Sequence, residues 1–139
     1  MPKKKIAEIF RFGISGIVGF VVDAGIVLLI TRELRLGPIV AQIIAFTVAA
    51  TVTWIINRHW TFAEQASENW LHEWSKYVAA NLVGAIVNNG VYGSLVLTMS
   101  TFSNEPVLAV AAGSLAGMGF NFGLSKFIVF RSIDIISND

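Results

Sequence analysis

Polar side chains recur at two depths within the long apolar stretches of this sequence. If successive stretches cross a membrane in alternate directions, an inner layer holds Ser15, Thr53, Asn81 and Asn121, and two cations, Arg58 and Lys126, lie about one helical turn closer to the inner surface. An outer layer holds Asp23, Gln42, Asn88 and Asn89. Amides both donate and accept hydrogen bonds, as sugar hydroxyls require, and Arg and Lys bind phosphate. The pattern predicts a binding path for a ligand with hydroxyls and a phosphate, such as a lipid-linked sugar.

The same polar residues also have a simpler interpretation, in which the amides join helices and the two cations anchor span ends. Asp23 argues for more than this, because an ionised carboxylate within a membrane costs about 2.5 to 3.5 kcal/mol and must be compensated. Its depth is close to that of Gln42 and Asn88. We therefore expect these three side chains around one polar cavity in the outer half of the membrane.

The residues that catalysis would need are missing from the apolar stretches. No second acidic residue pairs with Asp23, no Ser/His/Asp set lies at membrane depth, and no phosphate-cradling glycine loop is present. With no cysteine and only two histidines, a metal site is equally unsupported. We expect a protein that is not an enzyme and has no metal, no cofactor and no nucleic-acid partner.

The composition is that of a chain dissolved in lipid, with 55% hydrophobic residues, 14% charged residues and a mean hydropathy of +0.68. Crossing a hydrocarbon core takes about 20 helical residues. Four runs are long enough, at about residues 10–30, 39–56, 77–99 and 107–129. The sequence predicts an all-α polytopic membrane protein, a single membrane domain over residues 1–139. The basic opening resembles a signal peptide, but the long run after it predicts an uncleaved first span.

The basic residues predict the orientation of the spans. Eight of the ten lie before the first span, in the connection between spans two and three, or at the end of span four. Only Arg32 and Arg35 lie on the other side. By the positive-inside rule, both termini and the central connection are cytoplasmic.

The chain also resembles itself. An offset of 65 lays KYVAANLVGAIVNNG over RFGISGIVGFVVDAG, and an offset of 68 pairs Pro38 with Pro106, Arg58 with Lys126 and Phe62 with Phe130. This predicts two helix-pair repeats, at about residues 10–62 and 76–130, joined by a connection at 63–75. Two spans per repeat leave both copies in the same orientation, related by an axis along the membrane normal.

Several local expectations follow from these spans. Pro38 and Pro106 suit the first position of spans two and four, with Ser103 or Asn104 as a cap for span four. Trp54, Trp60 and Phe62 suit a headgroup belt. In the connection, one face of an interfacial helix carries Trp70, Leu71, Trp74 and Tyr77, and its water-facing surface carries Glu64, Glu68 and Glu73. Small-residue faces on spans one and four predict a homo-oligomer.

Three motifs carry a resemblance to a known family. They are RFGISGIVGFVVDAG in span one, TWIINRHWTF at the end of span two and NFGLSKFIVF at the end of span four. Together they resemble the GtrA-like family of small four-span bacterial membrane proteins, over about residues 10–131. Thr53 stands where the family pattern leads us to expect asparagine, so Asn121 is the better match.

The resemblance implies movement of a polyprenyl-phosphate-linked sugar across the bacterial cytoplasmic membrane, for decoration of cell-surface glycans. Besides this lipid-linked sugar and membrane lipid, it implies a glycosyltransferase as a partner. Two alternatives stay open, a non-transporting scaffold for the glycosyltransferase and a small drug or cation exporter. The exporter would need the charge of Asp23, whereas the offset of 65 pairs Asp23 with the neutral Asn88, which favours the sugar.

Overall fold

The computed structural model describes residues 2–131, which form helices and no strand. The described part has four helices long and apolar enough to cross a membrane: α1 (Pro2–Arg32), α2 (Pro38–Ile56), α3 (Trp70–Thr98) and α5 (Pro106–Leu124). The short helix α4 (Ser100–Asn104) precedes α5, and η2 (Ala63–Gln65) is a 3-10 turn. The prediction of an all-α, four-span membrane protein is confirmed.

The ends of the helices follow the local sequence in most places. Pro38 and Pro106 begin α2 and α5, as predicted, because a missing N–H costs nothing at this position. The predicted cap of α5 is wrong, since Glu105 occupies the cap position and makes no side-chain capping bond. The expected interfacial helix is not separate from span three either. Its residues form the first turns of α3, where Asn69 accepts a hydrogen bond from the backbone N–H of His72 at 3.1 Å.

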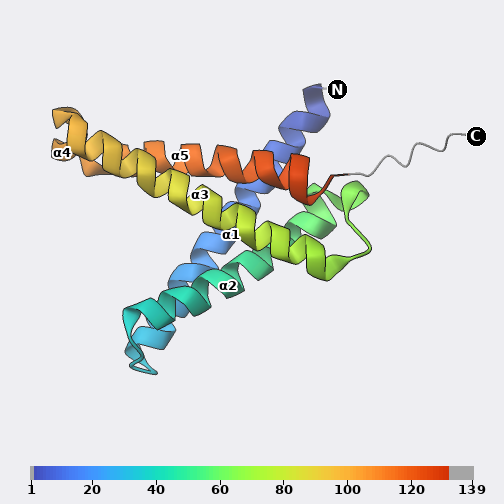
Figure 1. Ribbon diagram of the computed structural model, residues 1–139, viewed down its shortest axis with the longest axis horizontal. Helices are drawn as coiled ribbons and strands as arrows, with labels where there is room; N and C mark the ends of the chain where they lie inside the picture. The colour runs from blue at the N-terminus through green and yellow to red at the C-terminus, as the bar shows by residue number, and fades with distance from the viewer. Residues whose placement is uncertain (1, 132–139) are drawn as a thin grey trace, which may run out of the picture.

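The four long helices pack as two pairs, α1 with α2 and α3 with α5. Figure 1 shows the pairs diverging toward their turns, whereas the start of α1, the start of α3 and the ends of α2 and α5 lie on the same side of the molecule. We call this side the inner end. In both pairs, the first helix therefore runs away from the inner end and the second helix runs back to it. The duplication and its symmetry axis stay predictions.

Each pair ends in one π-helical turn that the sequence did not predict. After α2 the turn is η1 (Asn57–Thr61), and after α5 it is η3 (Ser125–Val129). The N–H of Phe62 donates to the carbonyl of Asn57 at 2.8 Å, and the N–H of Phe130 donates to the carbonyl of Ser125 at the same distance. The two turns therefore end alike, at the phenylalanines that the offset of 68 pairs.

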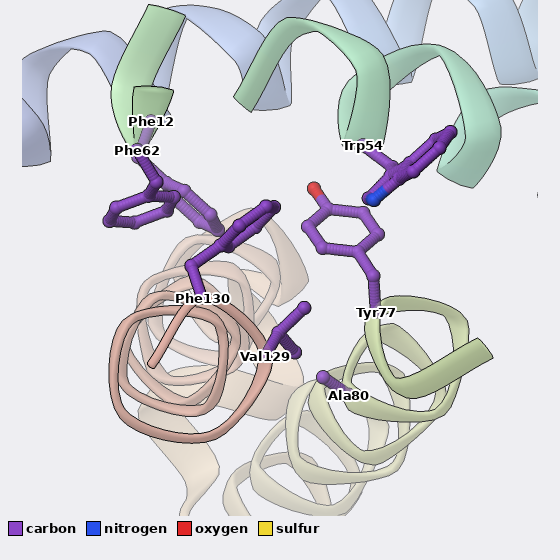
Figure 2. Packing of buried hydrophobic residues seen from close by; sticks show 7 residues of the cluster. All are labelled: Phe12, Trp54, Phe62, Tyr77, Ala80, Val129 and Phe130. Atoms are coloured by element: carbon purple, nitrogen blue, oxygen red, sulfur yellow. The ribbon is translucent and has the colours of Figure 1, made fainter. Parts of the chain in front are cut away.

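Both phenylalanines lie in a buried cluster at the inner end, which we call the aromatic cluster: Phe12, Trp54, Phe62, Tyr77, Ala80, Val129 and Phe130. Figure 2 shows the Phe130 ring between Phe62 and Tyr77. The Phe62 and Phe130 rings stack with centroids 4.9 Å apart, and Tyr77 meets Phe130 edge-on at 6.1 Å. The predicted headgroup belt is therefore wrong for Trp54 and Phe62, which are buried, whereas Trp60 is exposed. Tyr77, expected on an interfacial face, is buried too.

Candidate functional site: a polar cleft between the helix pairs

A cleft of about 530 Å³ lies between the two diverging pairs, and all four long helices line it. Its hydrogen-bonding side chains are Asp23, Gln42, Thr53, Asn57, Tyr77, Asn81, Asn88, Ser114 and Asn121. Gly13, Gly16, Gly19, Gly84 and Gly117 also line it. In the described chain, a Cβ built on Gly13 or Gly16 would meet nothing within 4 Å, so these two positions leave space for the cleft. At Gly19, Gly84 and Gly117 the missing side chain instead lets a neighbouring helix approach closely. The structure thus brings five of the eight predicted site residues, Asp23, Gln42, Asn81, Asn88 and Asn121, to one cleft.

The outer part of the cleft contains the carboxylate. Asp23 is half-buried, and its Oδ1 accepts a hydrogen bond from Nε2 of Gln42 at 3.4 Å. This bond is long, so it leaves the carboxylate able to accept further donors. Asn88 lies on the opposite pair, where α3 and α5 are so close that a Cβ on Gly113 would come within 2.6 Å of the side-chain and backbone oxygens of Asn88.

The inner part of the cleft contains an acceptor without a donor. Within residues 2–131, Oδ1 of Asn121 is buried and has no hydrogen-bond partner. It lies against Gly84, where an added Cβ would come within 1.8 Å of it. The amide of Asn81 donates to the carbonyl of Tyr77 at 2.9 Å, which leaves its own oxygen available. The oxygen of Asn81 can therefore accept a ligand hydroxyl, whereas Oδ1 of Asn121 is enclosed in the contact between α5 and α3.

Two further residues of the inner part were not among the predicted site residues. Asn57 donates to Oη of Tyr77 at 2.8 Å and accepts from Oγ1 of Thr61 at 2.7 Å. Both Asn57 and Tyr77 line the cleft. A sequence signal existed for Tyr77, because the offset of 65 pairs it with Phe12 and so adds one hydroxyl to an otherwise apolar position.

Asn89 does not take part in the cleft. Its side chain is exposed and donates to the carbonyl of Ala85 at 2.8 Å, one turn back on its own helix. Neighbouring residues on an α-helix are about 100° apart, and this step carries Asn89 out of the cleft that Asn88 lines. The expectation that placed Asn89 with Asn88 is corrected on this point.

Arg58 lies outside the cleft and is bound to protein groups. It donates to Oε1 of Glu73 at 2.6 Å and to the carbonyl of Ser67 at 2.8 Å. Glu73 also accepts from Nε1 of Trp54 at 3.0 Å and from the backbone N–H of Ser67 at 2.5 Å. The prediction of a water-facing Glu73 is wrong, because its side chain is fully buried. Three donors, from Arg58, Trp54 and the backbone of Ser67, satisfy the buried carboxylate.

Lys126 is the corresponding cation of the second pair, and it too lies outside the cleft. It forms an ion pair with Glu8, near the start of α1, and its ammonium lies 5.7 Å from the centre of the Phe122 ring. The sequence analysis did not single out Glu8. The signal available was its spacing, because the offset of 65 pairs Glu8 with Glu73.

A second hollow, of about 310 Å³, lies between the first turns of α1 and the segment from Trp60 to Gln65. Its charged lining consists of Lys4, Glu8, Arg11 and Glu64. The Lys4 ammonium, 2.7 Å from the carboxylate, lowers the pKa of the exposed Glu64. Arg11 donates to the carbonyl of Trp60 at 3.1 Å.

Polar groups from four membrane-spanning helices thus converge on one cleft, with cations beyond its inner end. A comparison with protein families finds a match of residues 11–132 to the model described as GtrA/DPMS, transmembrane domain. The chain belongs to this family. A search of curated proteins found no match. As a GtrA/DPMS transmembrane domain with four long apolar helices, the chain is a multi-pass membrane protein. Membership associates it with the transfer or flipping of sugars on a carrier lipid.

Proposed function

We propose that this GtrA/DPMS domain moves a polyprenyl-phosphate-linked sugar across the bacterial cytoplasmic membrane, without making or breaking a bond. The sugar passes through the cleft while the prenyl chain stays in lipid. The observation that carries the proposal is the cleft itself, which collects amide, hydroxyl and carboxylate side chains from all four spans. In lipid, such groups require partners, and a sugar supplies both donors and acceptors.

The chemistry of the lining supports an uncharged, hydroxyl-rich head group. Among the described residues that line the cleft, Asp23 is the acidic one and none is basic. A sugar carboxylate would find no cation there and would be repelled by Asp23. The phosphate belongs instead at the inner end, near the cations Arg58 and Lys126. By the positive-inside rule, this end lies at the cytoplasmic surface.

The test is transport of a labelled polyprenyl-phosphate hexose by the purified protein in liposomes. Asp23→Asn keeps the shape and most of the hydrogen bonding, so we expect substantial transport. Asp23→Leu and Asn88→Leu remove hydrogen-bonding groups from the cleft, and we expect transport to be lost. Asn89→Leu is the matched control, because Asn89 neighbours Asn88 but is exposed outside the cleft. It should transport like the unchanged protein.

Two results would contradict a sugar path. Full transport by the Asp23→Leu variant would show that the carboxylate is not on the path. Equal loss in Asp23→Asn and Asp23→Leu, with activity that follows a proton or sodium gradient, would favour a cation exporter that requires the charge.

A scaffold for a glycosyltransferase is the second candidate, and exposed surfaces favour it. Trp70 and Leu71 are exposed at the start of α3, and nothing within the described chain lies within 4 Å of a Cβ built on Gly119 or Gly123. These faces can receive another helix, either from a glycosyltransferase or from a second copy in a homo-oligomer.

A further inference from the structure

Two ion pairs at the inner end join the helix pairs reciprocally. Arg58, just after α2, binds Glu73 near the start of α3, and Lys126, just after α5, binds Glu8 near the start of α1. Each cation thus closes one helix pair and reaches the acid that opens the other. The offset of 68 pairs the two cations with each other, and the offset of 65 pairs the two acids. By sequence position alone, Arg58 and Lys126 are equivalent.

Their surroundings make the two pairs unequal. Glu73 is fully buried and accepts hydrogen bonds from Trp54, Arg58 and the backbone of Ser67. Arg58 is held in addition by the carbonyl of Ser67. Within residues 2–131, Glu8 accepts from Lys126 alone, and it borders the second hollow. One pair is therefore enclosed in a network and the other opens onto a cavity.

This difference decides which cation can exchange its carboxylate for an incoming anion. Displacing Glu73 would strand a buried carboxylate and three donors, and a buried charge that loses its partner is strongly destabilising. Glu8 can instead turn into the adjacent hollow, beside the cations Lys4 and Arg11. Lysine also suits exchange, because its ammonium is a compact point charge on a flexible stem, whereas the planar arginine fork is fixed by several bonds at once.

We propose that a lipid phosphate binds Lys126 by displacing the carboxylate of Glu8, while Arg58 stays bound to Glu73 and has a structural role. That the phosphate is the one on a sugar carrier rests on the proposed function. Lys126 follows Asn121 by five residues, roughly 7 Å along a helix. A phosphate on Lys126 therefore leaves the attached sugar within reach of the inner part of the cleft.

Glu8 then acts as a competitor that weakens phosphate binding. The apparent affinity of a site equals its intrinsic affinity multiplied by the fraction of the protein in which the site is free. Replacing Glu8 by glutamine removes the competing charge, so we expect about tenfold tighter binding of the lipid phosphate, whereas Lys126→Gln should weaken binding about tenfold or more. Arg58→Gln should lower the melting temperature and leave the affinity of the folded fraction unchanged.

The experiment measures binding of a short-chain polyprenyl phosphate without sugar to the full chain in detergent. The proteins are the unchanged chain, Glu8→Gln, Lys126→Gln and Arg58→Gln, with Lys3→Gln as a control for the loss of an exposed positive charge on α1. Melting temperatures of all variants are measured in parallel. Phosphatidylglycerol and inorganic phosphate are separate arms, because a phospholipid headgroup and a free anion present the same chemistry.

Tighter binding in Glu8→Gln, together with loss in Lys126→Gln alone, is the expected result. Equal losses in Arg58→Gln and Lys126→Gln, or unchanged binding in Glu8→Gln, would overturn the displacement. The same variant pattern at equal affinity for phosphatidylglycerol would overturn the assignment to the carrier lipid. If the expected pattern holds but no variant transports sugar in liposomes, the phosphate site stands and the transport function fails.

Discussion

At the scale of single residues, Glu73 is the side chain whose environment departs most from what its neighbours in the sequence suggest. It shares a polar connection with Glu64 and Glu68, so a water-facing position was expected. Its partners Trp54 and Arg58 come from α2 and η1. The residues within one turn of Glu73 give no indication that it contacts α2 and η1. This is why local periodicity placed the residue wrongly.

Replacing Glu73 tests this network. Glu73→Ala leaves the Arg58 charge and the Trp54 indole without their acceptor, and removing one member of a buried pair costs about 3 to 5 kcal/mol. We expect a clear fall in the melting temperature in detergent. Glu68→Ala is the control, because Glu68 is exposed in the same connection. Equal, small effects of both substitutions would contradict the buried network.

At the scale of elements, α5 contains two GxxxG patterns that the sequence cannot rank. The structure uses the first, Gly113 and Gly117, to bring α5 close to α3. The second, Gly119 and Gly123, has open space beside it within the described chain. Which of the two patterns packs against another helix depends on the face of α5 that α3 covers, and this is set only when the helices assemble.

Alanine substitutions separate the two patterns. A Cβ at residue 117 would come within 2.8 Å of the carbonyl oxygen of Gly84, a backbone atom that cannot turn aside. We expect Gly117→Ala to destabilise the α3–α5 packing by about 1 to 3 kcal/mol, as overpacking does, measured by thermal unfolding in detergent. Gly119→Ala should be neutral or slightly stabilising, because alanine favours helix. An equal loss in Gly119→Ala would show that another helix packs on that face.

Most of the elements could be predicted from the sequence, because span length, apolar composition and the two starting prolines are local properties. The bonds of Thr47 and Thr51 are local too, because each hydroxyl donates to a carbonyl one turn back on its own helix, at 2.8 and 2.7 Å. The π-helical turns η1 and η3 could not be predicted. Their shifted hydrogen bonds accompany the burial of Phe62 and Phe130 in a cluster assembled from all four long helices and their ends.

Most residues of the candidate site could be predicted from the sequence, but their contacts with the other helix pair could not. Asp23, Gln42, Asn81, Asn88 and Asn121 were identified because polar groups in lipid are costly and stand out. Asn57 and Tyr77 were missed because each lies at the edge of a span, where polar groups are ordinary. The carboxylate partners of Arg58 and Lys126 were missed because they are close only after the two pairs assemble.

At the scale of the whole molecule, the inner end and the two distant turns make a topology that can be tested directly. The chain has no cysteine, so single-cysteine variants carry one label site. In intact cells, a membrane-impermeant maleimide should label Leu36→Cys and Asn104→Cys, which are exposed in the turns. Glu68→Cys, at the inner end, should react only after the membrane is opened. The reverse pattern would invert the predicted orientation.

The aromatic cluster at the inner end has an electrical consequence for the membrane in which the protein sits. Phe12 and Tyr77 belong both to this cluster and to the lining of the cleft, so the cleft ends against packed rings. A continuous water column through the bundle would let ions run down the membrane potential, which is worth about 2.3 kcal/mol per elementary charge per 100 mV. Closed at the inner end by these rings, the cleft can hold water without opening such a column through the bundle.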